Sequence, residues 1–146
     1  MTKELDFENR IATLSGSVHE LMYRRLTDCF KQENIPLTAN QFQLMTRLWE
    51  QDGLHQNTLA KMLERDRSAL THMIDVLERK ELVKRKKDKN DKRAFCINLT
   101  AKGKKLESTA NACAEKTLKE ALGGLDEKSY QGLVAALERI RENLIL

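Results

Sequence analysis

Apolar residues recur at steps of three and four along most of this chain. The first such stripe lies within residues 8–31 and predicts a long helix there; it runs through Ile11, Leu14, Val18 and Leu21. Pro36 disfavours helical backbone at the residue before it, so this helix should end near Asn34. A second helix should start at Thr38, because Gln41 three residues later completes a capping box, and Gly53 is a suitable stop.

Two shorter helical segments follow, and a tight turn joins them. The first covers about residues 56–63, and the second covers about residues 67–80, with Asp66 as its N-cap. Leu70, Ile74 and Leu77 should pack the second segment inward. Its outer face is polar and carries Arg67, Ser68, Thr71, His72 and Asp75. This arrangement over residues 56–80 is typical of a helix-turn-helix.

The pattern changes to alternation after this pair. Phe95, Ile97 and Leu99 occupy every second position, which predicts a strand over residues 94–99 with these three side chains on its buried face. A partner strand over residues 82–86 and a polar loop over residues 87–92 complete a hairpin. We expect this 82–99 hairpin to be the wing of a winged helix-turn-helix.

Two helices should complete the chain. Thr100 is a good N-cap for one that runs to about Leu122, where Gly123 and Gly124 end it, and Asp126 can cap the last one. The last helix carries an apolar stripe of Leu133, Val134, Leu137, Ile140 and Leu144. The predicted fold is therefore mainly α with a small β-hairpin wing, built as one domain over residues 1–146.

The distribution of charged residues indicates a class of binding partner. Residues 79–93 hold nine bases and three acids, a net charge of +6, whereas the whole chain of 146 residues carries +4 and the remainder is therefore −2. A basic block confined to the wing and the end of the preceding helix indicates a polyanion such as duplex DNA. The alternative is a solvated charge run with no ligand.

Composition and motifs exclude several other classes. No apolar run approaches the roughly 18 residues of a membrane span, and the N-terminus has no secretory apolar core, so we expect a cytoplasmic protein. The sequence contains no glycine-rich phosphate loop and no G-x-S-x-G motif, so we predict no enzyme and no cofactor. Cys29, Cys96 and Cys113 are widely spaced, and His19, His55 and His72 lie on separate elements. We therefore predict neither a disulfide framework nor a metal site.

The ordered motifs resemble the MarR family of bacterial transcriptional regulators over nearly the whole chain. The most specific one is D-x-R followed by five residues and L-T, formed by Asp91, Arg93, Leu99 and Thr100. LTANQFQLMTRLWEQDG, LAKMLERDRSALTHMIDVLE and LTAKGKKL are also similar to family segments. The resemblance implies a homodimer joined by residues 8–31 and 101–146. It also implies a repressor or activator on a palindromic operator, often released by a small phenolic or aromatic ligand, an oxidant or a metal.

Two positions depart from the family pattern. The family commonly has glycine where Glu81 stands, and a left-handed backbone there would make glutamate unfavourable by about 1 kcal/mol. His55 replaces the usual threonine or serine at the start of the first short helix, which predicts a weaker cap.

The candidate DNA contacts divide between the recognition helix and the wing. Arg67, Ser68, Thr71 and His72 can reach base edges or phosphates, although Ser68 and Thr71 could equally be ordinary solvated positions. Arg93 should enter the minor groove with Asp91 orienting it, and the alternative is a simple hairpin salt bridge. We assign phosphate contacts to Lys84, Arg85, Lys87, Lys89 and Lys92.

The family resemblance also places effector pockets between the dimer helices and the winged part. Candidate lining residues are His19, Met22, Tyr23, Met45 and Trp49, and the alternative is that they are ordinary core or surface residues. We interpret the cysteines as buried and inert. A redox-sensing regulator with a reactive Cys29, and a winged-helix module that binds protein, stay open as alternatives.

Overall fold

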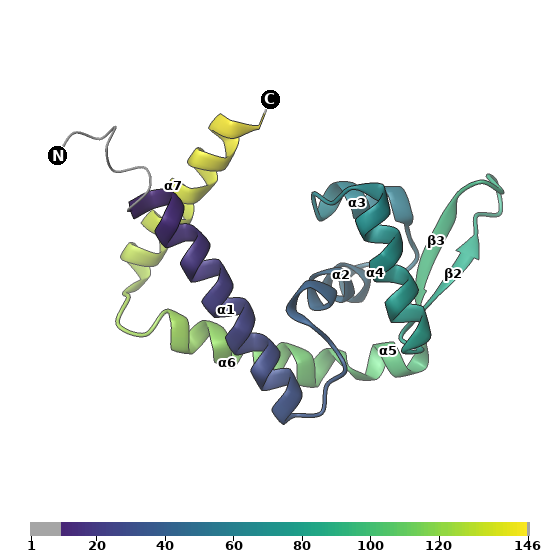
Figure 1. Ribbon diagram of the computed structural model, residues 1–146, viewed down its shortest axis with the longest axis horizontal. Helices are drawn as coiled ribbons and strands as arrows, with labels where there is room; N and C mark the ends of the chain where they lie inside the picture. Colours follow the sequence, from purple (N-terminus) through teal and green to yellow (C-terminus); the bar gives the residue numbers. More distant parts are fainter. Residues whose placement is uncertain (1–9, 146) are drawn as a thin grey trace.

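The computed structural model describes residues 10–145, and its seven helices and three strands form two regions (Figure 1). One region is an arm made of α1 (Ala12–Gln32), α6 (Glu107–Ala121) and α7 (Glu127–Leu144). The other contains α2 (Ala39–Glu50), α3 (Gln56–Met62), α4 (Arg67–Arg79), α5 (Ala101–Lys105) and the strands β1 (Leu54–His55), β2 (Val83–Lys87) and β3 (Phe95–Leu99). The predicted mainly α fold with a small β-hairpin wing is confirmed.

The predicted helix starts and turns are formed by the expected residues. Thr38 and Gln41 make the complete capping box of α2. Asp66, Thr100 and Asp126 each accept a hydrogen bond from the backbone amide three residues later. His55 makes no side-chain cap at α3, as expected. Residues 8 and 9 of the predicted first helix, and residue 146 of the last predicted segment, lie outside the described residues.

One apolar core holds α1, α2, α3, α4, α6 and the sheet together. Phe30, Leu44, Leu59, Leu70 and Ile97 are among its fully buried side chains. Trp49 closes one side, where its indole Nε1–H donates to the carbonyl oxygen of Gly103 at 3.0 Å. Gly103 is required there, because a Cβ at this position would lie 2.1 Å from the Leu82 carbonyl oxygen. This contact fixes α5 against the base of the wing.

The sheet differs from the predicted hairpin in two ways. It has a third strand, β1, and the order is β1–β3–β2 with both pairings antiparallel. Two residues are too few to show periodicity, so the sequence pattern could not reveal this strand. The buried face predicted for β3 is only partly correct: Ile97 is buried and Leu99 half-buried, but Phe95 is exposed at the end of the wing.

The predicted helix from Thr100 to Leu122 is divided. α5 ends at Lys105, and α6 begins at Glu107 after Leu106. In Figure 1 the chain leaves the winged region through α5 and continues along α1 as α6. The described part of the chain contains no helix that is both long and apolar enough to cross a membrane.

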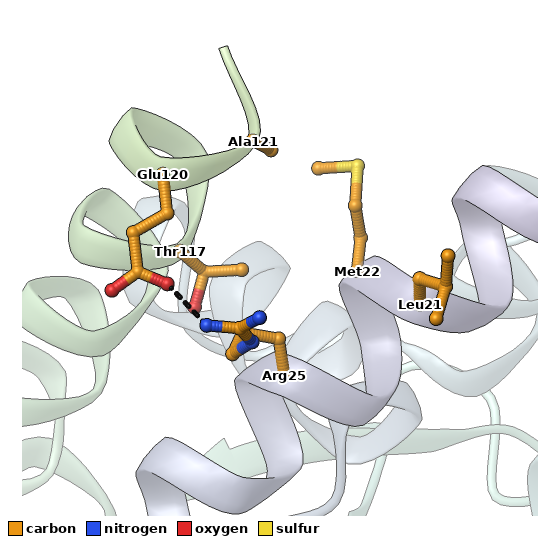
Figure 2. A pocket seen from close by; sticks show the side chains of 6 residues that line it. All are labelled: Leu21, Met22, Arg25, Thr117, Glu120 and Ala121. Carbon is orange, nitrogen blue, oxygen red and sulfur yellow. Dashed lines mark hydrogen bonds and ion pairs between the residues drawn. The ribbon is translucent and has the colours of Figure 1, made fainter. Parts of the chain in front are cut away.

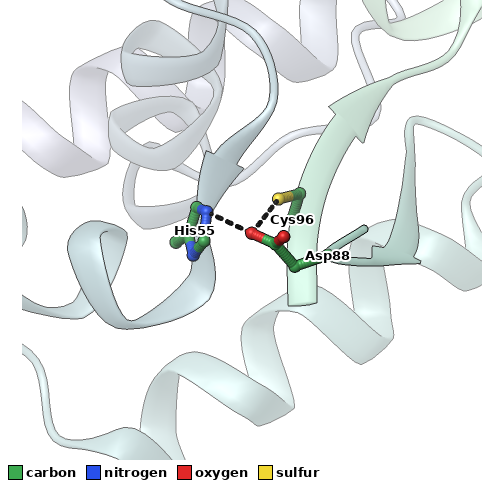
Figure 3. Close-up of side chains that lie close together, drawn as sticks. All are labelled: His55, Asp88 and Cys96. Carbon is green, nitrogen blue, oxygen red and sulfur yellow. Dashed lines mark hydrogen bonds and ion pairs between the residues drawn. The ribbon is translucent and has the colours of Figure 1, made fainter. Parts of the chain in front are cut away.

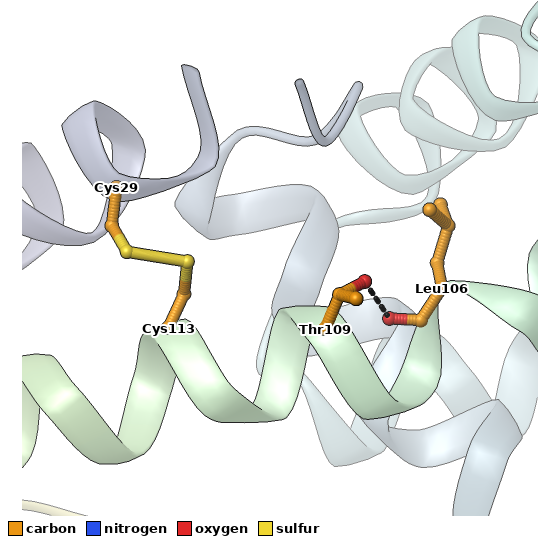
Figure 4. The surroundings of a disulfide bond; sticks show 4 residues. All are labelled: Cys29, Leu106, Thr109 and Cys113. Atoms are coloured by element: carbon orange, nitrogen blue, oxygen red, sulfur yellow. Dashed lines mark hydrogen bonds between the residues drawn. A yellow bond between two sulfur atoms is a disulfide. The ribbon is translucent and has the colours of Figure 1, made fainter. Parts of the chain in front are cut away.

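The prediction that the chain has no disulfide framework needs correction. Cys29 of α1 and Cys113 of α6 form a disulfide, with their Cα atoms 5.8 Å apart (Figure 4). The two residues are 84 positions apart, and only the packing of α1 on α6 brings them together. Cys96 is the free cysteine.

Candidate nucleic-acid interface

The first turn of α4 presents polar side chains to solvent. Arg67, Ser68 and His72 are exposed, whereas Leu70 and Ile74 on the opposite side are fully buried. Asp66 caps the helix by accepting the Ala69 amide at 2.7 Å, which fixes the direction of this turn. α4 therefore has the buried and the polar face that the sequence predicts for a recognition helix.

Thr71 is more restricted than its sequence position suggests. Its hydroxyl donates to the carbonyl oxygen of Arg67 at 2.8 Å and accepts from the side-chain amide of Gln56 at the same distance. The residue is half-buried. Its hydroxyl thus joins α3 to α4, and its methyl group is the part left for contact with a ligand.

The wing carries an exposed guanidinium at its end. The side chain of Arg93 is 95% exposed, and its Nε lies 3.7 Å from the Asp91 carboxylate. Asp91 also accepts the Arg93 backbone amide at 3.0 Å, so it orders the turn as well as the side chain. Lys84, Lys87, Lys89 and Lys92 are also exposed on or beside this hairpin.

A hollow of about 350 Å³ separates the recognition helix from the wing. Arg67 and Thr71 line it from α4, and Arg93 and Phe95 line it from the wing. The structure therefore brings the two predicted groups of site residues to the two sides of one concave surface.

Arg85 needs a corrected description. Its side chain is only 18% exposed, and its guanidinium pairs with Asp75 at 2.6 Å and with Glu78. It also donates to the carbonyl oxygen of Thr71 at 3.1 Å. These bonds hold β2 against α4 and leave Arg85 unsuited to a free phosphate contact.

The sequence interpretation missed Gln56 and Asn57 as residues near this surface. Both lie at the start of α3 and line the same hollow. Gln56 bonds Thr71 and lies 3.5 Å from the Nε of Arg85. The sequence did offer a signal for these two residues, because they form a polar first turn of the first short helix, beside the predicted recognition helix.

Backbone amides and a histidine stabilise one carboxylate at the start of the wing's tip loop. Asp88 accepts hydrogen bonds from the backbone of Asn90 and Asp91 and pairs with His55 at 2.9 Å. These interactions, led by the Asn90 amide, lower the pKa of Asp88 below its usual value. Asp88 is therefore an ionised group at neutral pH.

The five candidate effector residues do not converge on one pocket. Met45 is fully buried in the core, and Trp49 bonds Gly103. His19 and Tyr23 border an open groove on α1, and burial raises the pKa of Tyr23 although Arg65 and Gln43 oppose that effect. Met22 instead lines a hollow of about 150 Å³ between α1 and α6, which an ion pair between Arg25 and Glu120 crosses at 2.9 Å (Figure 2).

Comparison with known proteins gives a consistent result. Residues 37–95 match the model of the MarR family. A relative in Bacillus subtilis (strain 168), the uncharacterized HTH-type transcriptional regulator YybA, is 28% identical over 112 residues, which cover 77% of this chain and 75% of the relative.

Two solved structures of DNA complexes resemble almost the whole chain. A putative MarR family transcriptional regulator from Listeria monocytogenes, complexed with 26mer DNA, has a TM-score of 0.82 and 28% identity over 93% of this chain and 89% of that one. The MepR–DNA complex of S. aureus has a TM-score of 0.84 and 27% identity over 91% and 97%. Together with the capped recognition helix and the basic wing, these matches show that residues 37–95 form a MarR family domain and that the chain has the winged helix-turn-helix fold of MarR family transcriptional regulators.

Proposed function

We propose that this protein is a homodimeric, sequence-specific regulator of transcription, acting as a repressor on a palindromic operator. The observation that carries the proposal is the shared surface of Arg67 and Arg93, which border one hollow from opposite sides. In this arrangement the first turn of α4 enters the major groove and Arg93 enters the adjacent minor groove. Two similar proteins are known in complex with DNA, which supports DNA as the partner.

Contacts to bases come from Arg67, Ser68 and His72, because these side chains are exposed at the start of the recognition helix. Lys84, Lys87, Lys89 and Lys92 contact phosphates and contribute affinity without reading sequence. Asp91 holds the Arg93 guanidinium at the tip of the wing. Arg85 acts indirectly, by fixing the recognition helix relative to the wing.

The arm supplies the second half of the proposal. α7 has no buried residue within the described chain, and Leu133, Leu137 and Ile140 on it are each 38% or more exposed. Ile11, Leu14, Val18 and Leu21 at the start of α1 are also exposed. Large apolar surface of this kind marks an interface, and Figure 1 shows α7 and the start of α1 at the end of the molecule away from the winged region. We assign this surface to a second copy of the chain.

Arg93→Ala tests the DNA contact. We expect the affinity for the cognate site to fall by about tenfold or more in an equilibrium titration, because no other side chain at the wing tip can replace the guanidinium. Arg24→Ala is the matched control, since Arg24 is 63% exposed on α1 and pairs only with Glu20 among the described ion pairs. An unchanged affinity in the Arg93 variant would remove this residue from the mechanism. If no fragment of the promoter of its own operon gives a mobility shift with this protein, the protein-binding alternative is favoured.

We propose that a small aromatic ligand releases the protein from DNA. The candidate site for this ligand is the hollow lined by Met22 and Arg25. The guanidinium could pair with a carboxylate or phenolate of the ligand, and Leu21 and Met22 could contact its ring. Salicylate-like compounds should raise the melting temperature and weaken DNA binding. Absence of both effects would count against this class of ligand.

An oxidant is the second candidate signal, and the Cys29–Cys113 pair favours it. Forming the disulfide joins α1 to α6, and both helices belong to the arm that sets the spacing of the two winged regions. DNA affinity should then differ between oxidised and dithiothreitol-treated protein, and the difference should vanish in Cys113→Ser. Equal affinities would leave the disulfide as a structural crosslink.

A further inference from the structure

Three side chains that commonly bind transition metals meet at the tip end of the wing strands, where the loop of the wing begins. His55 ends β1, Cys96 lies directly opposite it in β3, and Asp88 follows the last residue of β2. One potential ligand atom of each lies within 4.8 Å of the others (Figure 3). The residues are 33 and 8 positions apart along the chain, so the pairing of β1 with β3 is what assembles them.

The carboxylate is already oriented toward the other two groups. Oδ1 of Asp88 accepts the Asn90 amide at 2.7 Å, which fixes the plane of the carboxylate. Oδ2 faces the His55 Nε2 at 2.9 Å and the Cys96 Sγ at 4.0 Å. Backbone hydrogen bonds to a ligating carboxylate act in this way as supporting contacts in metal sites.

The accessibility of the three residues suits a site that an ion can enter. The Asp88 side chain is 17% exposed and His55 46% exposed, and Cys96 is half-buried. Cys96 is outside the disulfide, so its sulfur is available. The ion pair between His55 and Asp88 is the competing use of these groups, and an ion would take its place.

The donor set selects the class of ion. Imidazole nitrogen, thiolate and carboxylate oxygen suit Zn²⁺ and similar divalent transition metals, whereas Mg²⁺ and Ca²⁺ prefer oxygen ligands alone. Thiolate and carboxylate together carry a charge of about −2, which offsets the divalent ion beside the basic loop of Lys89 and Lys92. A water molecule would complete four-coordination.

We propose that His55, Asp88 and Cys96 form a binding site for Zn²⁺ or a related divalent transition metal at the tip end of the wing strands. His55 immediately precedes α3, and it also lines the hollow between α4 and the wing. The ion therefore ties the helix-turn-helix to the tip-forming loop of the wing. It fixes the angle between the two surfaces that flank this hollow.

Titration of the full-length protein with Co²⁺ alone, in a reductant without thiols, tests the site directly. We expect one ion per subunit, visible d–d absorption of a four-coordinate ion and a near-ultraviolet thiolate-to-Co²⁺ charge-transfer band, all of which Zn²⁺ removes. Cys96→Ser should abolish the charge-transfer band and weaken Co²⁺ binding by at least about tenfold. Asp88→Asn should weaken it to a similar extent.

Two control variants keep the test specific. Cys113→Ser should retain the band, because its sulfur lies in the core near α1, and His72→Gln should retain it because His72 points from α4 to solvent. A wild-type protein without the charge-transfer band, or a Cys96→Ser protein that keeps it, would overturn the proposal. These spectroscopic readouts need no DNA, so a negative result would not contradict the proposed regulatory function. In the same way, a failure to bind DNA would not contradict the proposed metal site.

Discussion

Single residues in this protein show how local backbone geometry competes with side-chain identity. Glu81, which follows α4 after the cap residue Lys80, has a φ of 62°, in the left-handed region that favours glycine. Its backbone is nevertheless held on both sides: the amide donates to the Glu78 carbonyl oxygen at 2.9 Å, and its own carbonyl accepts from the Thr100 hydroxyl at 2.6 Å. The turn anticipated at this position is therefore present, and it is occupied by an unfavourable residue.

Glu81→Gly should stabilise the protein by about 1 kcal/mol, because glycine adopts this φ without a Cβ clash. The greater freedom of glycine in the unfolded chain reduces the gain but does not reverse it. Urea unfolding at one fixed protein concentration measures the change. Glu81→Ala serves as the control, since it removes the carboxylate and retains the Cβ. If alanine stabilises as much as glycine, the effect comes from charge instead of backbone strain.

Among the elements, β2 and α4 are joined by charge as well as by apolar contact. Arg85 of β2 is bound by Asp75 and Glu78 one turn apart on α4, and its backbone amide donates to Glu78 at 3.2 Å. The sequence showed Arg85 as one base in a basic block, and nothing in the local pattern distinguished it from Lys84 or Lys87. Only the packing of α4 beside β2 reveals which base is used internally.

Arg85→Ala should destabilise the fold by about 1–3 kcal/mol, because it leaves Asp75 and Glu78 without their shared partner. Arg85→Lys should recover only part of the loss, since an ammonium group cannot reproduce several directed bonds of a guanidinium. The measurement is again urea unfolding.

Lys84→Ala is the matched control for Arg85. Lys84 is exposed on the adjacent position of the same strand. Its removal should change stability by less than about 0.5 kcal/mol and should weaken DNA binding through a lost phosphate contact. If Lys84→Ala destabilised the protein as much as Arg85→Ala, the internal role assigned to Arg85 would be wrong.

At the scale of the whole molecule, the winged region buries its large apolar side chains, whereas the arm leaves many of them exposed. The winged region buries Leu44, Leu70 and Ile97 completely, whereas the arm leaves Leu14, Leu133 and Leu137 exposed. A helix with an apolar stripe and no partner is unstable by itself, because most helical stability comes from tertiary packing. In the proposed dimer, a second chain supplies this packing to the arm.

Leu137→Glu should weaken the dimer by at least about tenfold, because it places a charge in the proposed apolar interface. Sedimentation velocity over a range of concentrations gives the dissociation constant. Glu138→Arg is the control, as it changes the charge of the neighbouring exposed position on the same helix. A wild-type protein that sediments as a monomer would contradict the proposed dimer. It would also contradict the proposal that the protein binds a palindromic operator.

The sequence by itself determined the helices, their caps and the basic wing, because these depend on short-range periodicity and on residues three or four positions apart. Thr38, Asp66, Thr100 and Asp126 illustrate this, since each caps a helix by a contact within its own turn. The tertiary structure alone decided which distant groups meet: Cys29 with Cys113, Arg85 with Asp75, and His55 with Asp88 and Cys96. Such contacts depend on how helices and strands pack, and a one-dimensional pattern carries no record of that geometry.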